Sequence, residues 1–290
     1  MITTPYKSSL PPKFEVWPVE HLWHEYRVAA SKRAEIQPNI LANADAGYPT
    51  WVPDPTPKKH RLAVVGYGAS LRDTWPDLQT YTHIWTCSGS HDFLLERGII
   101  PTYHTDIDYR AYKADFIKKP QASVQYVMAT AVHPVYTEKL QDYQLGLFHC
   151  TSPHDYEYRG NYPAMSYGWD CGQQAIELAL SDGWKNIDLY GFDYSTPFDG
   201  TFKTNKLDTD SHAGPHGGQR SHLIYVVAKN IIFETTQTHL SACFAMDKLM
   251  GEHPELDLQI HSNELLLNFL ECRAFHERVF TLKEEYQHGS

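Results

Sequence analysis

The stretch Arg61–Asp73, RLAVVGYGASLRD, decides the fold expected for this chain. It begins with the apolar run Leu62–Val65, which is typical of a strand buried inside a sheet. The chain then turns through Gly66–Ser70 and continues into a predicted helix. A glycine-rich turn between a strand and a helix brings backbone N–H groups to a helix N-terminus, where a phosphate can bind. The stretch therefore predicts an α/β fold that binds a nucleotide.

Length and composition indicate an ordinary folded protein. The chain has 290 residues, 42% of them hydrophobic, and lacks the run of roughly 18 apolar residues that spans a bilayer. The 25 basic and 35 acidic residues give a net charge of −10, which argues against an extended nucleic-acid surface. Because the N-terminus lacks a basic region followed by an apolar core, we expect no secretory signal and a cytoplasmic protein. Five widely spaced cysteines predict reduced thiols.

Proline content divides the chain near residue 60. Residues 1–60 are predicted to be an N-terminal arm and helical extension, closed by a proline-rich linker at 48–59. From 61 to 283 apolar strands alternate with helices, which predicts a Rossmann-like, mostly parallel sheet with helices on both faces. The polar segment 191–218 is too long for a simple connection and is predicted to be a lid-like loop. Residues 284–290 are predicted to be a disordered tail.

The expected elements of this domain set the positions of the candidate site residues. Strands are predicted at 62–65, 83–87, 103–107, 124–129, 145–149, 187–190 and 256–260. Helical segments are predicted at 71–80, 92–97, 169–180, 219–236, 240–250 and 264–280. Ligands of open parallel sheets bind at the carboxyl ends of the strands. The residues that follow these strands are therefore the candidates for a binding site.

Small residues at these positions predict contacts with a nucleotide. Gly66 and Gly68 would let a phosphate approach the backbone, and Ser70 would cap the next helix or donate a hydrogen bond to phosphate. Ser88, after the second strand, would line the pocket or belong to a helix cap. Ser166 and Gly168 precede a helix and form a second candidate anion or ribose site. For Gly66–Ser70 the structural alternative is a tight turn that binds no ligand.

Carboxylates follow two of the strands. Asp106 and Asp108 alternate along one strand and therefore share a face, where they can hold Mg²⁺ or Mn²⁺ against a diphosphate. They can equally bond ribose hydroxyls or cap a loop. Asp193 follows the strand at 187–190, where an open sheet presents ligand-binding groups, with loop capping as the alternative.

Two histidines of the predicted lid are candidates for proton transfer. His212 and His216 lie among glycines and a proline, a composition that fits a mobile loop delivering a general acid or base. Zinc binding is the rival interpretation, because the two histidines are four residues apart. That spacing brings side chains together only on a helix, and Gly214–Pro215 disfavours a helix here.

The order of these motifs resembles two families, the MptE-like (6-hydroxymethylpterin diphosphokinase-like) proteins and the sialyltransferases of glycosyltransferase family 42. Both open on a strand and a G-x-G-P-S-L turn, matched here by Gly66–Leu71 with alanine in place of proline. The MptE-like proteins continue with a GI-x-P-D segment, which resembles Gly98–Thr102. The sialyltransferases carry an S-H-x-x-x-H loop, which resembles Ser211–His216 and places His216 on the histidine proposed as their general base.

The resemblance implies two enzymatic functions. The first is a glycosyltransferase, which moves a sugar from a nucleotide-sugar donor to an acceptor hydroxyl. His216 would then deprotonate the acceptor, and Tyr194 or His212 would stabilise the departing phosphate. The second is an ATP- and Mg²⁺-dependent diphosphokinase of a pterin-like molecule, using Asp106 and Asp108. A non-catalytic nucleotide-binding or interaction module is the third possibility. A homo-oligomer is compatible with all three.

Overall fold

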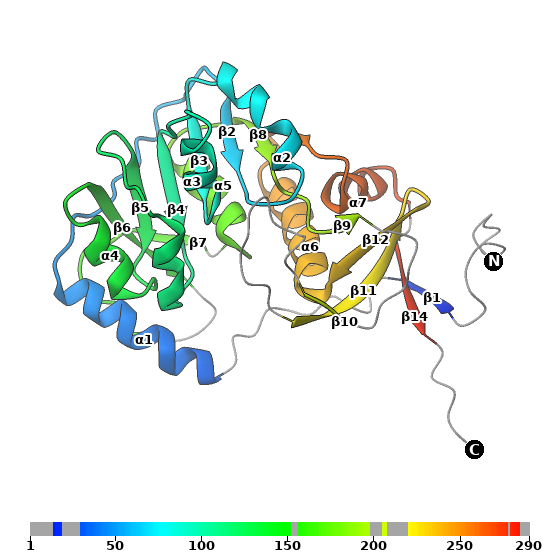
Figure 1. The fold of residues 1–290 in the computed structure, drawn as a ribbon, viewed down its shortest axis with the longest axis horizontal. Coiled ribbons are helices and arrows are strands. Elements are labelled where there is room, and N and C mark those ends of the chain that lie inside the picture. The colour runs from blue at the N-terminus through cyan, green and yellow to red at the C-terminus, as the bar shows by residue number, and fades with distance from the viewer. Residues whose placement is uncertain are drawn as a thin grey trace.

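The computed structural model describes residues 14–18, 30–151, 156–166, 168–197, 205–207, 220–277 and 279–284. Its centre is an eight-stranded sheet with the order β13-β8-β2-β3-β4-β5-β6-β7, in which every neighbouring pair is parallel (Figure 1). Its strands are β2 (Leu62–Val65), β3 (Ile84–Cys87), β4 (Tyr103–Asp106), β5 (Gln125–Ala129), β6 (Gln144–Thr151), β7 (Ala164–Ser166), β8 (Asn186–Tyr190) and β13 (Asp257–His261). The predicted Rossmann-like α/β class is thus confirmed.

Strand β2 lies inside this sheet, and all four of its residues are fully buried. Leu62 and Val64 pack into the larger core cluster, whereas Ala63 and Val65 pack into a second cluster. Alternate side chains of a strand point to opposite faces, so both faces of β2 are covered. This double burial explains why the strand is apolar throughout and contains no polar alternation.

Helices cover both faces of the sheet. They are α1 (Ala30–Asp45), α2 (Leu71–Thr74), η3 (Trp75–Thr80), α3 (Ser90–Leu95), η4 (Ala111–Phe116), α4 (Pro134–Leu140), α5 (Cys171–Ser181), α6 (Gln237–Glu252) and α7 (Leu265–Ala274). Helix α5 contributes to the larger core cluster, and α2, η3 and α3 contribute to the second. No helix within the described residues is long and apolar enough to cross a membrane.

The strand order creates a switch point beside β2. From β2 the chain builds the sheet outward, strand by strand, to β7. It then returns through α5 to β8, which pairs with the opposite edge of β2. The turns that follow β2 and β8 therefore meet at this switch point, and open parallel sheets have a binding crevice at the carboxyl ends of such strands.

A second sheet, which is antiparallel, was not predicted. It has the order β1-β14-β11-β12-β9, and β10 pairs with β11 off this path. Its strands are β1 (Phe14–Pro18), β9 (Thr196–Pro197), β10 (Asn205–Leu207), β11 (Arg220–Ala228), β12 (Ile231–Thr236) and β14 (Phe280–Glu284). Because β1 pairs with β14, this sheet joins segments from the two ends of the chain (Figure 1).

Two predicted helices are corrected by this sheet. The helix predicted at 219–236 is instead the hairpin of β11 and β12. Its apolar residues fit a helical period, but Lys229 and Asn230 have φ angles of 48° and 64°, the left-handed conformation of a two-residue hairpin turn. The helix predicted at 264–280 stops at Ala274, after which the chain enters β14.

The N-terminal extension packs against the parallel sheet. The fully buried Asn43 of α1 donates hydrogen bonds to the carbonyls of Thr130 and Val132, just beyond β5. Residues 48–59 were predicted to be a linker, but Trp51 is only 5% exposed and its N–H donates to the Leu147 carbonyl of β6 over 2.9 Å. The prolines limit this segment to a single bridge instead of a strand.

Candidate active site

A pocket of about 190 Å³ opens at the switch point beside β2. It lies where β2, β3 and β8 end and where α5 begins. Its lining residues are Gly66, Tyr67, Gly68, Cys87, Ser88, Asp170, Cys171, Gly172, Gly191, Phe192, Asp193, Tyr194, Ser195 and His239. Gly66, Gly68, Ser88 and Asp193 were predicted to bind a nucleotide, and the fold brings these four residues to one place.

Gly66 and Gly68 are required by the close approach of two turns. A Cβ atom on Gly66 would lie 2.5 Å from the Gly191 carbonyl oxygen, and one on Gly68 would lie 2.7 Å from the same oxygen. The Gly68 N–H donates to that oxygen over 2.9 Å. The turn after β2 thus packs directly on the turn after β8, which is a structural reason for both glycines independent of any ligand.

Ser70 and Asp193 are joined by hydrogen bonds. Asp193 is 2% exposed, and its carboxylate accepts hydrogen bonds from the Ser70 N–H over 2.8 Å and from the Ser70 hydroxyl over 2.5 Å. The Ser262 hydroxyl donates to the same carboxylate over 2.8 Å. Ser70 occupies the predicted N-cap position of α2, but its side chain makes no capping hydrogen bond to that helix. The protein's own carboxylate therefore holds the N-terminus of α2, and nucleotide contact by this pair stays a prediction.

The second candidate anion site, at Ser166 and Gly168, is held by hydrogen bonds to the side chain of Gln174. Ser166 ends β7, and its carbonyl accepts a hydrogen bond from Gln174 Nε2 over 3.0 Å. The Gly168 N–H donates to Gln174 Oε1 over 2.9 Å. Ser166 and Gly168 thus shape the start of α5, whereas Asp170, Cys171 and Gly172 are the residues of this segment that line the pocket.

Tyr194 and His239 both line the pocket, and the centres of their rings are 6.0 Å apart. Burial, together with the negative charge of Asp170, raises the pKa of Tyr194 well above its usual range. The phenol therefore keeps its proton, which it directs to the side chain of Asp170, another residue that lines the pocket. His239 was missed because the helix was predicted to start at residue 240, whereas it starts three residues earlier, at Gln237, and is capped by Thr236. His212 and His216 lie outside the described residues.

Asp106 and Asp108 are each paired with a cation of the protein. Asp106 is fully buried, with Oδ2 at 3.5 Å from Lys113 Nζ and Oδ1 accepting from the Cys171 thiol over 3.1 Å. Asp108 binds Arg110 through Nε–Oδ1 and Nη2–Oδ2 contacts of 2.8 and 2.5 Å. No cluster of three His, Cys, Asp or Glu side chains gathers within the part of the chain that the structure describes. Because each carboxylate already forms an ion pair within the protein, the two together do not offer a free pair of ligands to Mg²⁺. The metal site stays a prediction.

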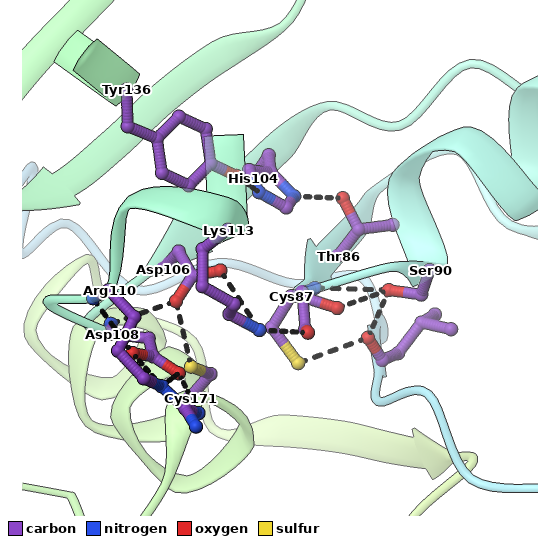
Figure 2. A network of polar contacts seen from close by, with 12 residues as sticks. Thr86, Cys87, Ser90, His104, Asp106, Asp108, Arg110, Lys113, Tyr136 and Cys171 are labelled. Carbon is purple, nitrogen blue, oxygen red and sulfur yellow. Dashed lines mark hydrogen bonds and ion pairs between the residues drawn. The ribbon is translucent and has the colours of Figure 1, made fainter. Parts of the chain in front are cut away.

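Lys113 is a candidate site residue that no sequence motif marked. It lies on η4 with its side chain 8% exposed, and its ammonium donates to Ser88 Oγ over 2.6 Å. Figure 2 shows the ammonium extending between the Asp106 carboxylate and the turn at Cys87. Burial alone would lower the pKa of Lys113, but the negative charge of Asp106, together with smaller contributions from neighbouring groups such as Asp108, outweighs it and raises that pKa. A permanent positive charge therefore lies directly behind Ser88.

The family model described as 6-hydroxymethylpterin diphosphokinase MptE-like matches residues 39–198. The chain belongs to the MptE-like family. The match runs from α1 to just beyond β9 and includes the segments that line the pocket, apart from His239. His212 and His216 lie beyond it. No curated protein matches the sequence of this MptE-like chain.

One solved structure shares the fold of this MptE-like protein, and a second gives a weaker alignment. The MAf glycosyltransferase from Magnetospirillum magneticum AMB-1 superposes with a TM-score of 0.58 at 12% identity, covering 84% of this chain. The chain spans 40% of the length of that glycosyltransferase. A mammalian sialyltransferase aligns at 12% identity over 82% of this chain and 81% of its own, with a TM-score of 0.39. The first likeness shows a common fold.

A buried histidine, His104, lies close to Lys113 in the network of polar contacts drawn in Figure 2. His104 of β4 is fully buried, with Nδ1 at 3.1 Å from the Thr86 hydroxyl and Nε2 at 3.2 Å from the Tyr136 hydroxyl (Figure 2). Burial, with smaller contributions from His91 and Lys113, lowers the pKa of His104 well below its usual 6.5. The folded protein thus keeps this imidazole neutral under conditions in which the unfolded chain would protonate it.

His104→Gln should flatten the acid dependence of stability. Because only the unfolded chain binds the proton, His104 lowers the free energy of unfolding as pH falls below about 6.5, by up to about 1.4 kcal/mol per pH unit. A glutamine amide can bond both hydroxyls without titrating. Urea unfolding of wild type and variant between about pH 7 and pH 5 measures the difference in slope. Equal slopes for wild type and variant would contradict the assignment.

Proposed function

We propose that this protein is a nucleotide-dependent glycosyltransferase that moves a sugar from a nucleotide-sugar donor to an acceptor hydroxyl. The observation that carries the proposal is the pocket at the carboxyl ends of β2, β3 and β8, beside the N-terminus of α5. Open parallel sheets bind nucleotides at such a switch point. The fold shared with the MAf glycosyltransferase supports the same class of reaction.

The reaction requires donors for a departing phosphate. The acceptor oxygen attacks the anomeric carbon, the bond from that carbon to the phosphate oxygen breaks, and His216 takes the acceptor proton. Negative charge then grows on the nucleotide phosphate and must be met by fixed hydrogen-bond donors. For this task we propose the Ser88 hydroxyl and the first N–H groups of α5, and the Tyr194 phenol once its proton turns from Asp170 to the phosphate. His212 is proposed to assist Tyr194.

An ATP-dependent diphosphokinase of a pterin-like molecule is the second candidate, and the family match favours it. Such chemistry uses Mg²⁺ to bridge the phosphates. Asp106 and Asp108 do not fit this task as they stand, because Lys113 and Arg110 already neutralise them. The pocket therefore favours glycosyl transfer over this alternative.

Thermal unfolding with a panel of ligands tests the proposal. We expect a CMP- or UDP-sugar at about 100 times its Kd to stabilise the protein by about 2.7 kcal/mol, which corresponds to a rise in Tm of roughly 5–10 °C. The controls are ATP with Mg²⁺, the same mixture with EDTA, and the free sugars. A response to ATP that EDTA abolishes would favour the diphosphokinase. No response to any nucleotide would favour the third possibility, a non-catalytic interaction module.

A further inference from the structure

The contact between Lys113 and Ser88 fixes which way the serine can donate. An ammonium group has three donors and no acceptor, so Ser88 Oγ must accept in the 2.6 Å hydrogen bond from Lys113 Nζ. The hydroxyl proton of Ser88 therefore points elsewhere. No described residue accepts it in a hydrogen bond, and Ser88 lines the pocket.

The backbone at Ser88 is held in a conformation that serine seldom adopts. Its φ angle is 55°, in the left-handed region that glycine adopts at no cost. The neighbouring Ser90 secures the turn, because its hydroxyl donates to the Val65 carbonyl of β2 over 2.8 Å and accepts from the Cys87 N–H over 3.1 Å. A serine kept at a position suited to glycine indicates that its hydroxyl has a function.

The ammonium group is itself immobilised. Lys113 Nζ lies 3.5 Å from Asp106 Oδ2 and 4.2 Å from the centre of the Phe116 ring, and its side chain is 8% exposed. Asp106 is anchored in turn by the Asp108 N–H over 2.9 Å and by the Cys171 thiol. This network holds one positive charge behind one hydroxyl, and that charge polarises the hydroxyl toward the pocket.

We propose that Lys113 is a positioning residue that makes Ser88 an obligate hydrogen-bond donor to a phosphate oxygen of the bound nucleotide. The inference rests on the proposed nucleotide pocket and deepens it by naming the group that binds the phosphate. Lys113 acts through Ser88, because the pocket is lined by the serine and not by the lysine.

Calorimetric titration of purified full-length protein tests this role. The probes are CMP, UMP and AMP, the three matching nucleosides, and inorganic pyrophosphate. Ser88→Gly removes the hydroxyl and relieves the left-handed backbone, which offsets the loss of the hydrogen bond from Lys113, so its Tm should stay close to that of wild type. We expect the same variant to bind the preferred monophosphate about tenfold more weakly or worse, and to bind its nucleoside unchanged.

The matched variant for Lys113 removes a balanced pair of charges. Lys113→Met alone would leave Asp106 as a buried unpaired charge and could unfold the protein, so the double variant Asp106→Asn/Lys113→Met is used. This double variant should bind the preferred monophosphate more weakly than wild type, to an extent similar to that of Ser88→Gly. Adding Ser88→Gly to it should cause no further loss, because both changes remove the same interaction. Additive losses would overturn a role exercised through Ser88.

The outcomes separate this inference from the proposed function. Wild-type affinity for a monophosphate in every variant would overturn the role of Lys113 and leave the nucleotide pocket intact. Binding of pyrophosphate but of no nucleotide, with the same loss in Ser88→Gly, would support the phosphate contact and contradict the proposed function. Binding of no probe by wild type would overturn both.

Discussion

Asp193→Ala should lower the free energy of unfolding by roughly 3 kcal/mol. The carboxylate is 2% exposed and accepts three hydrogen bonds, from the N–H and hydroxyl of Ser70 and from the hydroxyl of Ser262. Each buried donor left without a partner costs about 1–3 kcal/mol, although the two hydroxyls can rotate toward other acceptors. The loss corresponds to a fall in Tm of roughly 6–12 °C, measurable by thermal unfolding without ligand.

Asp142→Ala provides the matched control, because Asp142 is an exposed carboxylate remote in sequence from these contacts. Its effect should stay within about 0.5 kcal/mol of wild type. If the two variants unfold at the same temperature, the Asp193 network does not hold the turns after β2 and β8 together. If Asp193→Ala keeps its Tm but loses its response to a nucleotide, Asp193 contacts the ligand, as the sequence predicted.

Seven of the eight strands of the parallel sheet were predicted because each carries a local apolar signal, whereas the three-residue β7 was not predicted. The run Leu62–Val65 is apolar at every position, and the structure buries every position. The hairpin of β11 and β12 was not predictable from periodicity, since its apolar residues also fit a helical spacing. The Lys229–Asn230 turn decides between the two structures, and β14, which lies about 50 residues further along the chain, supplies the partner strand.

Local reasoning found the pocket but not the partners of its residues. Gly66, Gly68, Ser88 and Asp193 were marked because each follows a strand, and parallel strands present such residues at one edge. The carboxylate that engages Ser70 comes from 123 positions away. Lys113 reaches Ser88 from a short helix beyond the next strand, so only the folded chain reveals the pair.

His216→Ala should lower the rate of glycosyl transfer by about 100- to 10,000-fold, the usual contribution of a general base. The prediction rests on the resemblance of Ser211–His216 to the S-H-x-x-x-H loop of the sialyltransferases. It is measured as kcat with the nucleotide sugar that gives the largest rise in Tm. Wild-type activity should also fall below about pH 6.5, as a histidine base becomes protonated, and the variant should lose this dependence.

The donor should bind equally well to wild type and to this variant. A general base acts on the acceptor hydroxyl, whereas affinity for the donor comes from the pocket at the ends of β2, β3 and β8. The ligand-induced rise in Tm should therefore survive His216→Ala while kcat falls. His60→Ala, at an exposed position before β2, controls for the loss of a histidine as such. Full turnover in the His216 variant would exclude it as the base, and a joint loss of binding and turnover would place the 211–216 segment in donor recognition instead.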